Sequence, residues 1–324
     1  MQYATLGRTG LNCSRIGLGT WAFASQAYGD VPEAEAREAV RIALDLGINF
    51  FDSAPLYGIG SGPDAHDGVA EEVLGRALGA DRDRAIISTK FGRNPSTGIV
   101  PAFTAAQARK SVDESLLRMG VDHIDVLFFH SPFSPDDIHD DVWEGLNDVR
   151  DQGKVRSIGH SISMFRDTEG MARDWVAQRK IDVIQVVYSL MNREAADLIR
   201  DVGAQGCGVV ARETLANGFL TGAVTRDTVF PANNLNARYA REEIAERVDY
   251  VERLAAALTQ GTDLTIAQAA LRWALDNPGI SLALTGAKNR SELEDCAAAA
   301  DAPAFSPETH EAVARMHVKD YPGA

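Results

Sequence analysis

Short apolar runs alternate with helical patterns along nearly the whole chain of 324 residues. The runs are almost continuously hydrophobic, as strands are when helices cover both faces of a parallel sheet. Between them, apolar residues recur at the i, i+3, i+4 spacing of an amphipathic helix. Eight such strand-helix units predict an α/β fold, a closed (β/α)8 TIM barrel, with an open doubly wound sheet as the alternative. The predicted strands are residues 16–19, 49–52, 85–90, 124–130, 155–159, 183–188, 208–212 and 280–285.

Glycines and capping residues mark where the predicted helices begin and end. Gly47 and Gly120 stand at helix C-termini, where glycine readily adopts the left-handed conformation. Thr265 and Gln268 have the spacing of an N-terminal capping box. The predicted helices are residues 33–46, 69–78, 104–119, 138–152, 167–178, 194–202, 242–258 and 265–276, and a last one from Ser291 that is capped by Glu294.

Three further segments complete the predicted barrel. Residues 1–14 combine glycines with alternating small apolar residues, which predicts a short hairpin that closes one end of the barrel. Residues 58–68 and 213–240 are rich in glycine and polar residues, so we expect them to form loops over the edge where the strands end. A barrel of this kind takes about 250 residues or more as one unit, so residues 1–324 are predicted to form a single domain.

Charge and cysteine content restrict the classes of partner. The chain has 46 Asp and Glu against 32 Lys and Arg, and a net charge of −14, which disfavours binding to nucleic acid or to an anionic membrane. Cys13, Cys207 and Cys296 form neither a disulfide framework nor a zinc pattern, so no metal is predicted. No signal-peptide pattern and no apolar run of about 20 residues is present, which predicts a cytoplasmic protein. The sequence gives no indication of the oligomeric state.

Reactive side chains stand where three of the predicted strands end. Asp52, Lys90 and His130 each close an apolar run, and Tyr57 follows the first run in a turn. The carboxyl ends of parallel strands meet at one edge of a barrel, so we expect the four side chains to lie together. A single polar residue at a strand end is usually structural. Four of these types at successive strand ends instead predict a catalytic site.

These four groups suit proton donation to an oxygen that gains negative charge. A phenol has an ordinary pKa of about 10, and a nearby ammonium lowers that pKa, so Lys90 is expected to acidify Tyr57. Asp52 would hold the ammonium in place, and His130 would orient a substrate carbonyl. No side chain can donate hydride, so carbonyl reduction at this site requires a nicotinamide cofactor or its equivalent.

The same residues, with several neighbouring motifs, resemble the aldo-keto reductase family. The motifs run in order from about residue 5 to residue 300, so the resemblance covers nearly the whole chain. It implies a (β/α)8 barrel that binds NADPH, with Tyr57 as the general acid. The motifs are Ile-Gly-Leu-Gly-Thr-Trp at 16–21, residues 49–58, Glu-Val-Leu-Gly at 72–75, Ser-Thr-Lys at 88–90, residues 122–130, Gly-Lys-Val-Arg-Ser-Ile-Gly at 153–159, Gln185, and Leu-Ala-Asn-Gly-Phe-Leu-Thr-Gly at 215–222.

The resemblance also implies which residues bind the nicotinamide and the substrate. In the family a Ser-Asn pair and a Gln hold the carboxamide; Ser161 and Gln185 match, but Ile162 stands at the Asn position. Arg212 is expected to stack on the nicotinamide ring, with a barrel-rim ion pair as the alternative. The expected substrate pocket is Trp21, Tyr57 and His130, and the expected cofactor-binding residues are Gly19, Thr20, Trp21, Asp52, Ser161, Gln185, Arg212, Leu215, Gly286, Lys288, Arg290 and Glu292.

The segment after the last predicted strand resembles the adenosine-phosphate site of the family. A helix N-terminus together with Lys288 and Arg290 attracts a phosphate. Glu292 stands where the family usually has Gln or Arg, and its carboxylate would repel a ribose phosphate but accept a hydrogen bond from a ribose hydroxyl. NADPH is the expected cofactor, and NADH is the alternative.

The predicted function is the NADPH-dependent reduction of an aldehyde or ketone. The polar loop and the Asp-Ser-Ala-Pro sequence at 52–55 suggest a sugar or a nucleotide-linked sugar as the substrate. One alternative is the reduction of a conjugated enone in a deoxysugar, and another is a regulatory or scaffold subunit that binds NADPH with little turnover. The intact set of four reactive groups favours catalysis. His160 is interpreted either as a pocket residue or as a structural histidine, and the acidic residues of 136–141 as a solvated helix start.

Overall fold

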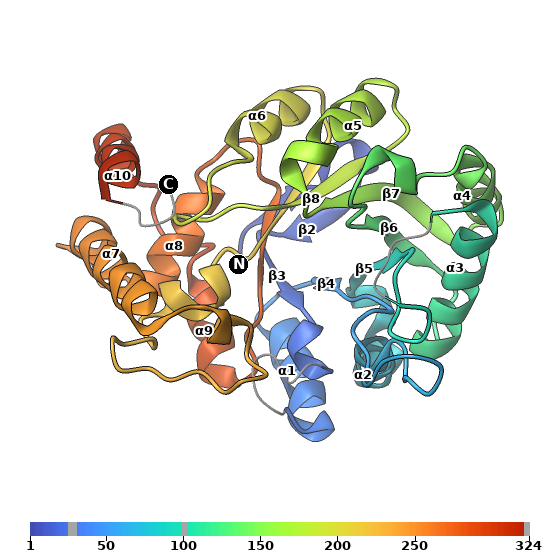
Figure 1. The fold of residues 1–324 in the computed structure, drawn as a ribbon, viewed down its shortest axis with the longest axis horizontal. Coiled ribbons are helices and arrows are strands. Elements are labelled where there is room, and N and C mark those ends of the chain that lie inside the picture. Colours follow the sequence, from blue (N-terminus) through green and yellow to red (C-terminus); the bar gives the residue numbers. More distant parts are fainter. Residues whose placement is uncertain (25–30, 99–102, 321–324) are drawn as a thin grey trace.

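The computed structural model describes residues 1–24, 31–98 and 103–320. Eight parallel strands close into a barrel in the order β10-β3-β4-β5-β6-β7-β8-β9, and helices surround it (Figure 1). Because β10 pairs with both β9 and β3, the predicted closed barrel is confirmed and the open sheet is wrong. The strands are β3 (Ile16–Gly19), β4 (Phe50–Asp52), β5 (Ile86–Phe91), β6 (Ile124–His130), β7 (Val155–Ile162), β8 (Val183–Val187), β9 (Gly208–Arg212) and β10 (Leu282–Thr285).

The helices agree with the predicted ones to within about two residues at their ends, except at the start of α4. α4 begins at Val142 rather than at residue 138, because residues 135–137 first form a 3-10 turn. The capping pair predicted for the last helix is wrong, since the side chain of Asn289 accepts from the backbone N–H of Glu292 and caps α9. A C-terminal helix, α10, was not predicted. The helices are α1 (Glu33–Asp45), α2 (Val69–Leu78), α3 (Ala105–Met119), α4 (Val142–Asp151), α5 (Phe165–Ala177), α6 (Ala196–Ala204), α7 (Arg241–Thr259), α8 (Ile266–Leu275), α9 (Arg290–Ala298) and α10 (Pro307–Asp320).

The predicted N-terminal hairpin is present and closes the end of the barrel where the strands begin. β1 (Tyr3–Thr5) and β2 (Asn12–Ser14) pair antiparallel. Gly7 between them has a φ of +52°, and a Cβ on it would lie 2.2 Å from the backbone nitrogen of Gly208, so the hairpin approaches the start of β9 closely. Leu6 is fully buried and joins the apolar cluster inside the barrel, together with Cys13, Phe50, Val126, Phe128, Val183, Val210, Leu282 and Leu284.

The strand register brings the ends of neighbouring strands to one level. Asp52 pairs with Gly19 on one side and with Ser88 on the other. Farther round the barrel, Ser161 pairs with His130 and with Gln185. The opposite end is filled by apolar side chains and the hairpin, so the polar groups of the interior gather at the carboxyl ends of the strands.

Candidate active site

Asp52, Lys90 and Tyr57 form the centre of the site. Asp52 is the last residue of β4, Lys90 lies on β5, and Tyr57 is in the turn that follows β4. The ammonium of Lys90 donates to Oδ2 of Asp52 at 2.7 Å and to the phenolic oxygen of Tyr57 at 3.1 Å. Lys90 and Asp52 are 1% and 3% exposed, so the ion pair is shielded from water. The structure therefore brings together three of the side chains that the sequence predicts to converge.

The other oxygen of the Asp52 carboxylate accepts two more hydrogen bonds. Ser88 Oγ donates to Asp52 Oδ1 at 2.7 Å, and Gln185 Nε2 donates to the same atom at 2.8 Å. Gln185 in turn accepts from Ser161 Oγ at 3.1 Å. A continuous hydrogen-bonded chain thus runs from the end of β7 across β8 and β4 to the ammonium and the phenol.

Burial and the neighbouring charges together determine the ionisation of the phenol and the ammonium. Burial raises the pKa of Tyr57 above its ordinary value, and the lowering by Lys90 does not overcome it. The prediction that the pKa of Tyr57 is lowered is therefore wrong for the protein without a ligand, although the effect of Lys90 has the predicted sign. Burial alone would lower the pKa of Lys90, but Asp52 and Tyr57 outweigh it, so that pKa is raised and the ammonium stays charged.

His130 lies beside the phenol and is neutral. Its ring centroid is 6.0 Å from that of Tyr57, in an edge-to-face arrangement. Burial, followed by the positive charges of Lys90, Arg93 and Arg212, holds the pKa of His130 well below its ordinary value. Its Nδ1 atom is buried and has no hydrogen-bond partner among the described residues. A neutral imidazole at this place can donate one hydrogen bond to a substrate oxygen.

Residues 19–21 line the same end of the barrel at β3. The hydroxyl of Thr20 is buried and contacts the backbone oxygen of Asp52 at 3.1 Å and Ser53 Oγ at 2.9 Å. Trp21 is half-buried, and its ring lies 6.4 Å from the ring of Tyr57. Gly19 is the register partner of Asp52. These residues therefore connect β3 to Asp52 and place the ring of Trp21 beside the phenol.

Arg212, at the end of β9, is engaged by the protein itself. Its guanidinium pairs with Glu213 at 2.5 Å and donates to the backbone oxygen of Ile162 at 2.9 Å. The barrel-rim ion pair considered for this residue is thus present. The side chain of Ile162 is buried in the core outside the barrel, so it supplies no polar group to the site. Leu215 follows in the loop and is half-buried.

The second group of predicted cofactor residues follows β10. Gly286 and Arg290 are exposed, and Lys288 is half-buried. The carboxylate of Glu292 accepts from the backbone N–H of Lys288 at 2.8 Å and from Asn289 Nδ2 at 2.8 Å. Glu292 therefore lies over the N-terminus of α9 and already uses donors that a phosphate there would need.

His160 does not face the site. It pairs in register with Phe129, and its ring packs 5.3 Å from that of Trp175 on α5, so it points from β7 toward the helices. Neither of its ring nitrogens has a hydrogen-bond partner among the described residues. Burial lowers the pKa of His160 to about 3. The pocket interpretation of His160 is wrong, and the histidine is part of an aromatic cluster.

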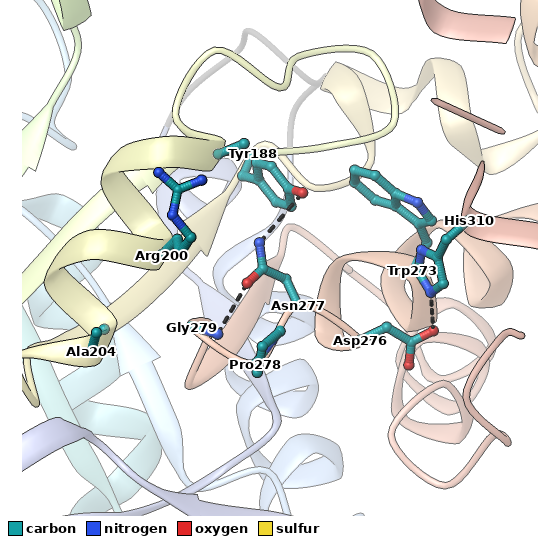
Figure 2. A pocket seen from close by; sticks show the side chains of 11 residues that line it. Tyr188, Arg200, Ala204, Trp273, Asp276, Asn277, Pro278, Gly279 and His310 are labelled. Carbon is teal, nitrogen blue, oxygen red and sulfur yellow. Dashed lines mark hydrogen bonds and ion pairs between the residues drawn. The ribbon is translucent and has the colours of Figure 1, made fainter. Parts of the chain in front are cut away.

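Two cavities lie outside the centre of the site. One of about 690 Å³ lies between α6, the end of α8 and α10, where Tyr188 contacts Asn277 and His310 contacts Asp276 (Figure 2). None of its lining residues belongs to the predicted constellation. The other, of about 540 Å³, is bordered by Leu56 and Gly58 on both sides of Tyr57 and by residues 95–98. The second cavity is bordered by the sequence neighbours of Tyr57, but none of the four reactive side chains lines it.

Cysteines and acidic clusters supply no further reactive centre in the described part of the chain. Burial raises the pKa of each thiol, those of Cys13, Cys207 and Cys296, to about 12. In residues 1–24, 31–98 and 103–320, no group of three His, Cys, Asp or Glu side chains is arranged to hold a metal ion. No helix in these ranges is long and apolar enough to span a membrane.

Ser88 and Ser53 also contact the central groups, although neither was predicted as a site residue. Ser88 contacts Asp52 directly, and the backbone oxygen of Ser53 accepts from the Lys90 ammonium at 2.8 Å. A signal for Ser88 was available, because it precedes Lys90 by two residues and side chains two apart in a strand share a face. The contact of Ser53 uses only its backbone, which no side-chain pattern reveals.

Comparison with known proteins gives matches along almost the entire chain. The model of the Aldo/keto reductase family matches residues 15–317. L-galactose dehydrogenase of Arabidopsis thaliana is 31% identical over 306 residues, which cover 92% of this chain and 88% of that protein. A probable voltage-gated potassium channel subunit beta of Arabidopsis thaliana is 30% identical over 321 residues, which cover 93% of this chain and 92% of that protein.

A solved structure gives an independent comparison of the fold. The holo form of an aldo-keto reductase from Bacillus halodurans matches with a TM-score of 0.78 and 23% sequence identity. The match covers 98% of this chain and 96% of that chain. At this level of identity, the likeness is one of fold.

Proposed function

Because this chain belongs to the aldo-keto reductase family, whose members are oxidoreductases that use nicotinamide cofactors, we propose that it reduces an aldehyde or ketone to the alcohol with NADPH. The observation that supports this most directly is the distance of 3.1 Å between the Lys90 ammonium and the Tyr57 phenol, with Asp52 holding the ammonium from the other side. The three groups form a proton donor at the mouth of the barrel.

Tyr57 is the general acid in this proposal. Its raised pKa keeps the phenol protonated at neutral pH, so a proton is available to transfer. As negative charge develops on the substrate oxygen, the phenolic proton moves to that oxygen and a phenolate remains on Tyr57. Lys90 stabilises the phenolate, because its ammonium already donates to the same oxygen atom.

His130 would orient the carbonyl for this transfer. Its neutral ring is edge-on to the phenol, and burial makes protonation of the imidazole unfavourable. A neutral imidazole can donate to the carbonyl oxygen without giving up its proton. Trp21 would form the wall of the substrate pocket on the other side of Tyr57.

The donor set at the strand ends fits the nicotinamide. A carboxamide needs both donors and acceptors, and the hydroxyl of Ser161 and the amide of Gln185 offer both while they are 2% and 1% exposed. The amide of Gln185 has a second N–H besides the one that Asp52 accepts. Ser161 and Gln185 would hold the nicotinamide, with Gly19, Thr20, Arg212 and Leu215 around them. When bound, the cofactor supplies the hydride.

The residues at the proposed adenosine-phosphate site would determine whether NADPH or NADH binds more tightly. Lys288 and Arg290 favour the extra phosphate of NADPH by their charge, whereas the carboxylate of Glu292 opposes it. Dissociation constants for both cofactors, measured by fluorescence titration, test this part of the proposal. We expect tighter binding of NADPH. Equal or tighter binding of NADH would contradict it and would make Glu292 a ligand of the ribose hydroxyls.

The catalytic assignment is tested with Tyr57→Phe. Oxidation of the reduced cofactor is followed with a panel of aldehydes, ketones and aldose sugars. We expect wild-type protein to turn over at least one of them. Tyr57→Phe should lose nearly all turnover, at least about 100-fold, while its dissociation constant for the cofactor stays within a few-fold. Wild-type turnover by Tyr57→Phe would contradict the role of the phenol.

Two findings among the relatives define the panel and the competing function. One relative is named L-galactose dehydrogenase, so hexoses are also tested in the oxidative direction, with the oxidised cofactor supplied and its reduction followed. An enone-containing sugar in the panel tests the enone alternative. Another relative is named as a potassium channel subunit, which favours a cofactor-binding regulatory subunit as the second candidate. Tight cofactor binding without turnover of any compound would favour the regulatory subunit.

A further inference from the structure

The Asp52 carboxylate is held from three directions. Ser88 Oγ and Gln185 Nε2 both donate to Oδ1, at 2.7 and 2.8 Å, and Lys90 Nζ donates to Oδ2 at 2.7 Å. All four residues are at most 3% exposed, so water does not compete for these bonds. The next acceptor for the Ser88 hydroxyl, the backbone oxygen of Phe51, is 3.4 Å away, so the carboxylate is its main partner.

The orientation of Lys90 depends on that carboxylate. An ammonium has three donor directions, and those of Lys90 are taken by Asp52 Oδ2, the Ser53 backbone oxygen and the Tyr57 phenol. If the carboxylate turned, the ammonium would follow its strongest partner and its alignment with the phenol would be lost. The two bonds on Oδ1 prevent this rotation, because both would have to break.

We propose that Ser88 and Gln185 are positioning residues for the proton donor. They fix Asp52, Asp52 fixes Lys90, and Lys90 is thereby aimed at the phenol of Tyr57. The inference rests on the proposed function, since it assumes that Tyr57 is the acid. Gln185 also accepts from Ser161, so a single buried amide joins the residues that would hold the nicotinamide to the residues that would donate the proton.

The charges around Tyr57 set the direction of the expected effect. The negative charge of Asp52 raises the pKa of the phenol, and the positive charges of Lys90 and Arg212 lower it. Two donors on Oδ1 offset part of the charge of Asp52. Removing one of them leaves that charge less neutralised and the ammonium less well aligned, so ionisation of the phenol should require higher pH. The other nearby titratable groups are Arg93 after β5 and His130 on β6.

Ser88→Ala tests the inference against a matched control. Ser157→Ala removes the hydroxyl of another buried strand serine, which lies on β7 and pairs in register with Val126 of β6. We expect Ser88→Ala to lower kcat about 10- to 100-fold, the range for a hydrogen bond to a charged group, with KM and cofactor affinity within about two-fold. Ser157→Ala should keep wild-type kcat. Wild-type kcat in Ser88→Ala, or an equal loss in Ser157→Ala, would overturn the proposal.

Ionisation of the phenol provides a second measurement that needs no turnover. The near-ultraviolet absorbance of tyrosinate is titrated in cofactor-free protein, and the curve of the matching Tyr57→Phe variant is subtracted. The midpoint for Tyr57 should lie at higher pH in Ser88→Ala than in wild-type protein, and an unchanged midpoint would overturn the proposal. If Ser88→Ala fails to fold, Ser88→Cys keeps the volume with a weaker donor and should shift the midpoint in the same direction.

Gln185 is distinguished from a residue that only holds the cofactor by comparison with Ser161. Ser161→Ala removes the hydroxyl that donates to Gln185 but leaves the bond from Gln185 to Asp52. In the cofactor-free titration, Gln185→Leu should move the Tyr57 midpoint to higher pH, because it removes a donor from Asp52, whereas Ser161→Ala should leave the midpoint at the wild-type pH. Equal midpoints in the two variants would overturn the role of Gln185. Absence of turnover in wild-type protein would instead contradict the proposed function.

Discussion

Single buried residues in this barrel ionise according to their immediate partners. Lys90 keeps its charge in a nearly water-free position because Asp52 and Tyr57 compensate for its burial. His160, equally buried, packs against the ring of Trp175, and among the described residues neither of its ring nitrogens has a hydrogen-bond partner, so it stays neutral far below its ordinary pKa. The same physical cost of burying a charge thus gives a permanent cation at one place and a neutral ring at the other.

The neutral state of His160 predicts acid lability. Its pKa is about 3 in the folded protein against an ordinary value of 6.5, so between these values only the unfolded chain binds the proton. The free energy of unfolding should therefore fall as pH falls from about 6.5 toward about 3. His160→Leu removes the imidazole and with it this pH-dependent loss of stability. The midpoint of acid unfolding, measured by circular dichroism, should therefore move to lower pH. His139→Leu, at an exposed histidine, is the control and should leave the midpoint unchanged.

The reactive residues could be predicted from sequence because each terminates an apolar run. Asp52, Lys90 and His130 are strand-end residues, and parallel strands bring their ends to one edge whatever the details of packing. The direction of the pKa of Tyr57 could not be predicted, since it depends on how completely the turn buries the phenol. The side chain of His160 points toward the helices because His160 pairs in register with Phe129 of β6, and this register could not be predicted from the sequence.

The elements that carry the site are fastened by a buried ion pair behind the strands. Glu71 on α2 is fully buried; it accepts from Thr89 Oγ1 on β5 at 2.5 Å and from Arg118 Nε on α3 at 2.6 Å. Thr89 is the neighbour of Lys90, and α2 follows the loop that begins with Tyr57. The ion pair therefore fixes α2 and α3 relative to the strand that carries the ammonium.

Breaking this ion pair from one side should destabilise the protein. Arg118→Met leaves Glu71 buried without its cation, and we expect the free energy of unfolding to fall by about 3 kcal/mol or more. The comparison is Arg76→Met, which breaks exposed ion pairs with Glu33 and Glu72 and should cost at most about 1 kcal/mol. Denaturant unfolding of both variants measures the difference. Equal losses in the two variants would mean that the buried Glu71–Arg118 pair contributes no more to stability than the exposed pairs of Arg76.

At the level of elements, the apolar periodicity predicts the interior of each helix better than it predicts the residue at which the helix begins. The capping box at Thr265 is confirmed, because both of its hydrogen bonds are local. The start of α9 was misplaced, since Asn289 competes successfully with Ser291 for the capping position. The start of α4 was misplaced because a 3-10 turn with Pro135 precedes it. Alternative helix starts differ little in free energy, so a sequence pattern does not distinguish between them.

The molecule as a whole has one apolar core inside the barrel and a larger one between strands and helices. The inner core is closed at the start of the strands by the hairpin of β1 and β2, through Leu6. Arg8 extends this attachment, since its backbone N–H donates to the Gly206 oxygen at 2.8 Å and its side chain pairs with Asp182 at 3.2 Å. The hairpin is therefore part of the barrel structure rather than an appendage.

Loss of the hairpin contact should affect stability and not catalysis. Leu6→Ala removes a fully buried side chain far along the barrel from the reactive groups, so we expect a loss of about 2–5 kcal/mol in the free energy of unfolding. kcat and KM of the folded fraction should remain at wild-type values. Leu117→Ala is the control, because that side chain is 83% exposed and its removal should be nearly neutral. A changed kcat in Leu6→Ala would mean that the floor of the barrel influences the proton donor.

The filled interior also governs the movement of small molecules. With Leu6 and the apolar side chains of the strands blocking one end, nothing can pass through the middle of the barrel. Among the described residues, Tyr57 lies at the carboxyl ends of the strands, so small molecules approach it from that end and not through the barrel. Two molecules that enter from the same end obstruct each other, so the closed floor makes the order in which they arrive and leave a consequence of the architecture.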